Sequence, residues 1–172
     1  MKTKILFPLL AVMLLIGFSA CKLGGESNYS PRLMLLNPAK LNSDTTLMLG
    51  YNAEGNIKID SLHVNDTVVI TLVGEGFSND LKNFTITVTE PADIEMLAPH
   101  DTIAKYFASE SDFVNGKILF GNDIVWMSYP FQFVAKKAKD KVKLNFSLTS
   151  DAKEVNNTAS ILVEFPIKPE LQ

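Results

Sequence analysis

Residues that could carry out metal or acid–base chemistry are few and scattered along the 172-residue chain. The two histidines, His63 and His100, lie in different segments, and no His-x-His, HExxH or CxxC spacing accompanies them. Zinc sites are built from closely placed nitrogen and sulfur ligands, so the sequence gives no support for a metal. A serine hydrolase lacks support as well, because no GxSxG nucleophile elbow is present. Both histidines are therefore expected to be structural or solvated.

The acidic residues of the segment 110–123 are the next candidates. Glu110, Asp112 and Asp123 could approach one another there, and calcium is held by several oxygen ligands. Their spacing does not follow an EF-hand loop, and a paired-carboxylate glycosidase has still less support. We expect a solvated acidic loop, no cofactor and no catalytic residue.

The single cysteine, Cys21, follows a three-part pattern at the start of the chain. A basic start is followed by an apolar run over residues 5–18 and then by small Ser19 and Ala20. At about 1.5 Å per residue, fourteen residues do not comfortably cross a hydrocarbon core of about 30 Å. The pattern predicts a secretory signal peptide over residues 1–20.

The stretch Phe18-Ser19-Ala20-Cys21 resembles the bacterial lipobox, where signal peptidase II cleaves before a cysteine that becomes lipidated. The resemblance implies that Cys21 is the mature N-terminus, carrying a diacylglyceryl thioether and an amide-linked acyl chain such as palmitate. Several buried acyl chains would anchor the protein stably to a membrane. A plain signal peptide with an incidental cysteine is the alternative.

Residues 21–31 are expected to form a flexible tether, because "KLGGESNYSP" is rich in Gly, Ser and Asn and has no hydrophobic period. Surface-exported lipoproteins of Bacteroides-type bacteria carry acidic residues just after the cysteine. The stretch Lys22 to Glu26 matches that pattern weakly, so the periplasmic face of the outer membrane and the cell surface both stay open.

The remaining chain has the size and composition of one domain, expected over residues 32–172. From Cys21 onward it has fourteen basic and nineteen acidic residues, a net charge of −5. Nucleic-acid binding depends on neutralising phosphates, so this acidic balance argues against a nucleic-acid partner. With Cys21 lipidated no disulfide can form, and stability must come from an apolar core.

Period-two alternation of apolar and polar residues predicts β-strands in this domain. The clearest strands are expected over 57–60, 68–73, 84–89, 141–149 and 159–165, with Pro166 ending the last one. Gly121 to Asp123 and the segment 150–157 are expected to be hairpin connections, and Pro130 suggests a bend or an edge position. The segment 91–107 shows helical spacing, with Asp101 as a candidate cap, and predicts one or two short helical turns.

Many short antiparallel strands with turn signals between them predict an all-β sandwich. The run "LHVNDTVVITLVGEGFSNDLKNFTITV" is similar to the early strands of immunoglobulin-like domains of bacterial envelope proteins, and residues 130–167 look like their last three strands. The whole chain resembles small immunoglobulin-like lipoproteins of Bacteroides-type bacteria. This resemblance implies an envelope location and no particular activity.

Two surface features could bind a partner. Trp126 and Tyr129 lie in the most aromatic stretch, where core packing and a sugar-stacking platform are the two interpretations. Five lysines between residues 136 and 143 indicate either a solvated edge strand or contact with anionic lipid or polysaccharide.

Four Asp-Ser/Thr pairs followed by an apolar residue or Thr resemble the O-glycosylation acceptor motif of Bacteroides-type bacteria. The hydroxyls that would carry the glycan are Thr45, Ser61, Thr67 and Thr102. Asp-Thr is also common turn chemistry at the start of a strand, so the motif has a structural alternative.

Together these patterns predict a membrane-anchored envelope lipoprotein with one immunoglobulin-like β-sandwich, non-enzymatic, and active in binding or assembly. Its partners would be the membrane through the anchor, and another envelope protein or a glycan. A carbohydrate-binding accessory protein and an enzyme inhibitor that uses residues 91–107 as a protruding loop are the alternatives.

Overall fold

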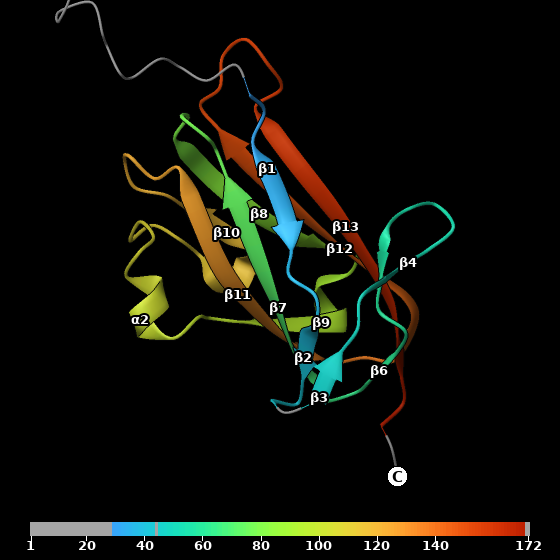
Figure 1. Ribbon diagram of the computed structural model, residues 1–172. Helices are drawn as coiled ribbons and strands as arrows, with labels where there is room; N and C mark the ends of the chain where they lie inside the picture. The colour runs from blue at the N-terminus through green and yellow to red at the C-terminus, as the bar shows by residue number, and fades with distance from the viewer. Residues whose placement is uncertain (1–28, 44, 171–172) are drawn as a thin grey trace, which may run out of the picture.

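The computed structural model describes residues 29–43 and 45–170, which form a sandwich of two β-sheets (Figure 1). The first sheet contains β1 (Arg32–Leu35), β2 (Ala39–Leu41), β3 (Thr45–Leu47), β7 (Thr67–Glu75), β9 (Ile94–Leu97) and β11 (Trp126–Ala135). The second contains β4 (Gly50–Tyr51), β5 (Ile57–Lys58), β6 (Leu62–His63), β8 (Leu81–Val88), β10 (Lys117–Leu119), β12 (Lys139–Ser150) and β13 (Thr158–Lys168). The described helical segments are short, namely η1 (Pro91–Asp93), α2 (Asp101–Ala104) and η2 (Phe113–Asn115). The predicted all-β sandwich with short helical turns is confirmed.

The strand order is that of an immunoglobulin-like domain. In the first sheet β7 lies between β1 and β2 on one side and β11 on the other, and β9 follows β11. In the second sheet the order is β10, β8, β12, β13. The first sheet corresponds to the A-B-E-D strands of that fold, and β8, β12 and β13 correspond to C, F and G. β10 pairs with β8 beside these three strands but follows β9 along the chain, so it has no counterpart in the usual strand order. After β3 the chain crosses to the second sheet, where β5 and β6 pair in parallel with β13.

The core lies between the two sheets and follows from the alternation of the long strands. The four alternating apolar residues of β12 are fully buried, as predicted, and Lys141 and Lys143, which alternate with them, are exposed. Phenylalanine rings fill the space between the sheets: Phe131 meets Phe146 with ring centroids 5.4 Å apart, and Phe133 meets Phe165 at 5.5 Å. Such contacts between facing strands supply the stability that a disulfide-free domain needs.

Three local predictions are wrong: two because strands pair with distant partners, and one because of a local hydrogen bond at the start of α2. Ile94–Leu97 forms a strand instead of a helical turn, because β11 offers it a hydrogen-bonding partner, and His100 rather than Asp101 caps α2. The segment Gly121 to Asp123 is not a hairpin, since β10 pairs with β8 while β11 pairs with β7 in the other sheet.

Pro166 does not end the last strand. Residues 140 and 141 of β12 stand opposite this one residue of β13, forming a bulge, and the ladder resumes at Ile167. Proline has no backbone N–H to donate to the neighbouring strand. At a bulge the regular pairing is already interrupted, so proline is tolerated there without loss of a ladder hydrogen bond. Pro130 does occupy an edge position, because β9 pairs with β11 only from Gln132 to Ala135.

The described chain enters and leaves at opposite ends of the sandwich. In Figure 1 the start of β1 lies at the top, near the loop that joins β12 and β13, and the C-terminal end lies at the bottom, below β6. No helix among the described residues is long and apolar enough to cross a bilayer.

Candidate functional site

Glu164 is the most distinctive charged residue of the domain. Its neighbours in β13, Val163 and Phe165, point into the core, so alternation places Glu164 on the outer face of the second sheet. Lys143 of β12 and Lys58 of β5 are its register partners on either side. Only 8% of the Glu164 side chain is exposed, because the loop between β4 and β5 covers it.

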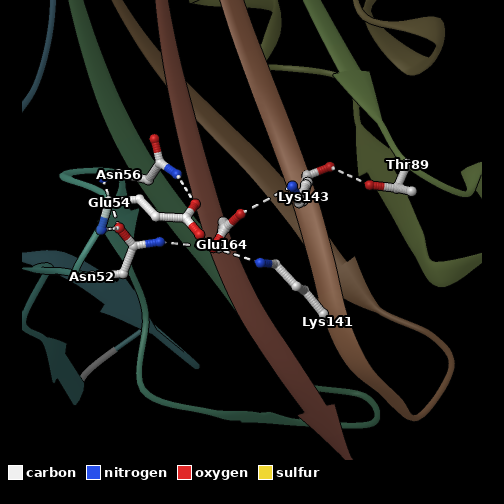
Figure 2. A network of polar contacts seen from close by, with 7 residues as sticks. All are labelled: Asn52, Glu54, Asn56, Thr89, Lys141, Lys143 and Glu164. Atoms are coloured by element: carbon white, nitrogen blue, oxygen red, sulfur yellow. Dashed lines mark hydrogen bonds and ion pairs between the residues drawn. The ribbon is translucent and has the colours of Figure 1, made fainter.

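Three side chains contact the Glu164 carboxylate (Figure 2). Asn52 Nδ2 donates a 2.8 Å hydrogen bond to Oε2, and Lys141 Nζ lies 3.0 Å from the same oxygen. Lys143 Nζ lies 3.3 Å from Oε1 as an ion pair without hydrogen-bond geometry. The hydrogen bond from Lys141 is the main cause that lowers the pKa of Glu164, and Lys143 adds to it against the opposing effect of desolvation.

Asn52 connects this carboxylate to the turn between β4 and β5. Its Oδ1 accepts hydrogen bonds from the backbone N–H groups of Glu54, at 3.0 Å, and Asn56, at 2.9 Å.

A groove of about 420 Å³ runs between this turn and the strands, and it is lined by side chains of both charges, including Lys58 and Asp60. A carboxylate with a lowered pKa stays ionised at neutral pH and makes a poor general acid. The arrangement therefore fits a structural clamp better than a catalytic centre.

A second concave surface lies beside Trp126, at the first residue of β11. The side of β11 that faces α2 has no paired strand before Gln132, and a hollow of about 320 Å³ opens along this edge. Trp126 is 57% exposed, and Tyr106, which follows α2, is 68% exposed on the same hollow. Beneath them Phe107 packs against Phe120 with ring centroids 5.6 Å apart.

The hollow beside Trp126 is apolar and aromatic. None of its lining residues is charged, and the side-chain hydrogen-bonding groups are the Tyr106 hydroxyl, the Trp126 indole and the Ser128 hydroxyl. Exposed aromatic rings with a polar atom at one edge suit the face of a sugar, an apolar side chain or a lipid interface. No His, Asp, Glu or Lys side chain lines the hollow to act as a base toward the Ser128 hydroxyl.

Tyr129 does not belong to this surface, so its assignment as a surface binding residue together with Trp126 is wrong. Tyr129 is 1% exposed and packs edge-on against Phe107 and Phe84. Residues three apart on a strand point to opposite faces, so the spacing alone could have separated it from Trp126. Burial raises the pKa of the Tyr129 hydroxyl. Tyr106 is the residue that shares the hollow with Trp126, and the sequence analysis missed it. Tyr106 lies just after α2, and no pattern in its own segment indicates that it lies beside Trp126.

Cys21, the predicted lipidation site, lies outside the described residues. Of the four candidate glycosylation hydroxyls, Thr45 and Thr102 are exposed, whereas Ser61 and Thr67 are half-buried. Asp66 accepts hydrogen bonds from the His63 backbone N–H at 2.7 Å and Asn42 Nδ2 at 2.8 Å, so the Asp66-Thr67 pair serves a turn.

The remaining candidates have structural roles. Nδ1 of His100 accepts the backbone N–H of Thr102 at 3.3 Å at the start of α2. Asp112 accepts hydrogen bonds from the backbone and side chain of Asn115. Within residues 29–43 and 45–170, no group of three or more His, Cys, Asp or Glu side chains could hold a metal ion.

The lysine-rich run does not mark an edge strand, because β12 lies between β8 and β13. Lys141 and Lys143 contact Glu164, and Lys136 Nζ lies 3.0 Å from Glu95 Oε2. The expected solvated edge strand is therefore not found. Three of the five lysines form ion pairs with glutamates of neighbouring strands.

Comparisons with known proteins give no family for this chain. No family model matches it, and no curated protein matches it. Among solved structures, a crystal structure of a FixG-related protein from Vibrio parahaemolyticus is similar over 77% of this chain and 99% of that chain, with 14% identity and a TM-score of 0.36. A likeness at this level carries no argument about activity, and the fold assignment rests on the strand pairing given above.

Proposed function

We propose that this protein is an envelope lipoprotein, anchored to the outer membrane through Cys21, that acts as a non-enzymatic binding or assembly module. The observation that carries the proposal is the placement of the chain ends: the start of β1 lies at one end of the sandwich and the C-terminal end lies at the other (Figure 1). A domain anchored through its N-terminal segment would hold the turns after β2, β6 and β11 toward a partner.

Another envelope protein is the favoured partner. Exposed Lys137 in the turn after β11 and exposed Lys139 at the start of β12 lie at the end opposite the start of β1, where an acidic partner surface could meet them. The two concave surfaces described above offer a clamp of paired charges and an apolar hollow, and the lining of neither places a serine, threonine or cysteine beside a base. A protruding inhibitory loop over residues 91–107 is not favoured, because β9 ties this segment into the first sheet.

A glycan is the second candidate ligand. Trp126 and Tyr106 present exposed rings to one hollow, which is the arrangement that stacks against a sugar face. Titration with soluble oligosaccharides, followed by the fluorescence of Trp126, tests this candidate. Tyr106→Ser should weaken the response several-fold, whereas Tyr51→Ser, which changes an exposed tyrosine of β4, should leave it unchanged.

Intact mass of the protein from the membrane fraction of its host tests the anchor. A chain from Cys21 carrying acyl chains supports the proposal, and Cys21→Ser should move the protein out of that fraction. An unmodified chain cleaved elsewhere would overturn it.

A further inference from the structure

Four exposed apolar side chains gather at the end of the sandwich where the described chain begins. They are Tyr29, Phe77, Val125 and Trp126, with exposed fractions of 68, 37, 39 and 57%. They come from three segments: the residues before β1, the turn between β7 and β8, and the point where the loop after β10 enters β11. We call these four residues the aromatic rim.

Ring, backbone and strand-pairing contacts join the rim into one surface. The rings of Tyr29 and Phe77 lie 5.4 Å apart. Gly76, next to Phe77, donates its N–H to the carbonyl oxygen of Val125 at 2.8 Å. Trp126 is the register partner of Glu75, so the strand that leads into the Phe77 turn lies directly beside Trp126.

Phe77 adopts an unfavourable backbone conformation to reach this surface. Its φ is +58°, in the left-handed region that bulky residues avoid at a cost of about 1–2 kcal/mol. Phe77 is 37% exposed and lies in a turn in which the Asn79 N–H donates a 3.0 Å hydrogen bond to the Gly76 carbonyl oxygen. Its ring contacts Tyr29 and is not part of the core cluster. A strained backbone that places an aromatic ring outside the core is the kind of outlier that accompanies a functional surface.

Charges around the rim are largely paired. Arg32 Nη2 lies 2.6 Å from Glu75 Oε2, and its guanidinium lies over the Phe77 ring, 5.8 Å from the centroid. Lys82 Nζ lies 3.4 Å from Asp80 and 3.3 Å from Asp151. A surface of exposed rings whose neighbouring charges are paired fits a zwitterionic lipid surface. Anionic lipid should add little to its affinity, because few basic side chains are left unpaired to attract it.

The reach of the chain places the rim near a bilayer. Seven residues separate Cys21 from Tyr29, and even fully extended they span at most about 29 Å. An anchor at Cys21 would thus keep the rim at high effective concentration beside the membrane. Tryptophan and tyrosine favour the headgroup region, where the ring is partly desolvated and its polar atom stays hydrated.

We propose that the aromatic rim inserts into the headgroup interface of the membrane that carries the anchor, so that the domain stands on the bilayer in one orientation. This inference rests on the proposed anchoring through Cys21. In this orientation the turns after β2, β6 and β11 point away from the bilayer (Figure 1).

The chain offers a direct test, because Trp126 is its one tryptophan and Cys21 its one cysteine. The chain from Cys21, which contains every described residue, is coupled through its thiol to a maleimide lipid in phosphatidylcholine vesicles. The fluorescence of Trp126 should shift to the blue on coupling. Lipids brominated near the glycerol end of the acyl chain should quench it more than lipids brominated near the methyl end, since interfacial groups lie about 5–10 Å deep.

Paired variants decide whether the rim is responsible. Tyr29→Ser combined with Phe77→Ser should reduce the quenching about twofold, because interfacial binding scales with buried apolar area. Tyr51→Ser, a change of an exposed tyrosine on β4, should leave it unchanged. Equal fluorescence in brominated and ordinary vesicles would overturn the inference, as would a blue shift produced by soluble oligosaccharide without vesicles.

Chemical coupling separates this test from the test of the anchor. A protein that is unlipidated in its host, yet shows quenching when coupled, would refute the proposed function and leave the rim's affinity for lipid intact. A lipidated protein without quenching would refute the rim alone.

Discussion

Asn52 and Glu164 lie 112 positions apart in the sequence and share a 2.8 Å hydrogen bond that fastens the β4–β5 turn onto β13 (Figure 2). β5 itself makes two register pairs with β13, at Val163 and Glu164. The hydrogen bond between Asn52 and Glu164 is therefore a main support of the β4–β5 turn. Its removal should cause a measurable loss in the free energy of unfolding.

Glu164→Ala should lower the free energy of unfolding by about 1–3 kcal/mol, because the Asn52 amide loses its acceptor. Lys141 and Lys143 are about half exposed and can be rehydrated, which limits the loss. Urea unfolding measures the change. Asp60→Ala is the matched control: its carboxylate is 96% exposed and 3.7 Å from Lys58, so the variant should stay within about 0.5 kcal/mol of the parent.

Stability should fall in acid because of Glu164. The pKa of this carboxyl is lower in the folded protein than its ordinary value of 4.5, so the unfolded chain takes up the proton first. Its contribution is fully present above about pH 4.5 and is lost as the pH falls through the folded pKa. Glu164→Gln lacks this contribution. Its deficit in unfolding free energy against the parent should be larger near neutral pH than at about pH 3, and an equal deficit at both would contradict the assignment.

Trp126 and Tyr129 should respond in opposite ways to truncation. Tyr129→Ala should cost about 3–5 kcal/mol, because it removes a fully buried ring from the core. Trp126→Ala, at an exposed position, should change the free energy of unfolding by about 0.5 kcal/mol or less. Thermal unfolding of the two variants makes the comparison, and a large loss for Trp126→Ala would show that its ring supports the fold.

Phe77→Asn should keep or raise stability while weakening contact with lipid. Asparagine tolerates positive φ, so relief of strain at +58° should offset the lost ring contacts with Tyr29 and Arg32 and add up to about 1 kcal/mol. Urea unfolding and Trp126 quenching in vesicles are measured on the same sample. A clear loss of stability would mean that the ring is there for packing.

Thr45 and Thr102 should be the glycosylated positions if the host modifies the chain, because both are exposed. The half-buried Ser61 and Thr67 should stay unmodified. Peptide mapping of the protein from its host locates the glycans. A glycan on Thr67 would contradict the accessibility argument, since this residue is half-buried.

Much of the fold could be predicted because alternation is local. The apolar positions of β8 and β12 and the hairpin between β12 and β13 follow from period two and from the polar turn between them. The strand at Ile94–Leu97 could not be predicted, since its apolar spacing fits a helical turn and only pairing with β11 makes it extended. The end of β13 was missed for a similar reason: the bulge that accommodates Pro166 lies on the neighbouring strand.

The candidate sites divide in the same way. By itself the sequence determined the all-β class, the buried face of each long strand, the lipobox-like cysteine and the lack of spaced catalytic or metal-binding motifs, because each depends on neighbouring residues. Tertiary structure alone decided that Asn52 meets Glu164, that Tyr106 meets Trp126 across one hollow, and that Phe77 stands beside Tyr29. Tyr106 and Trp126 are 20 positions apart in the sequence, Tyr29 and Phe77 are 48 apart, and Asn52 and Glu164 are 112 apart. Sheet pairing brings such distant segments together, and no local sequence pattern encodes that pairing.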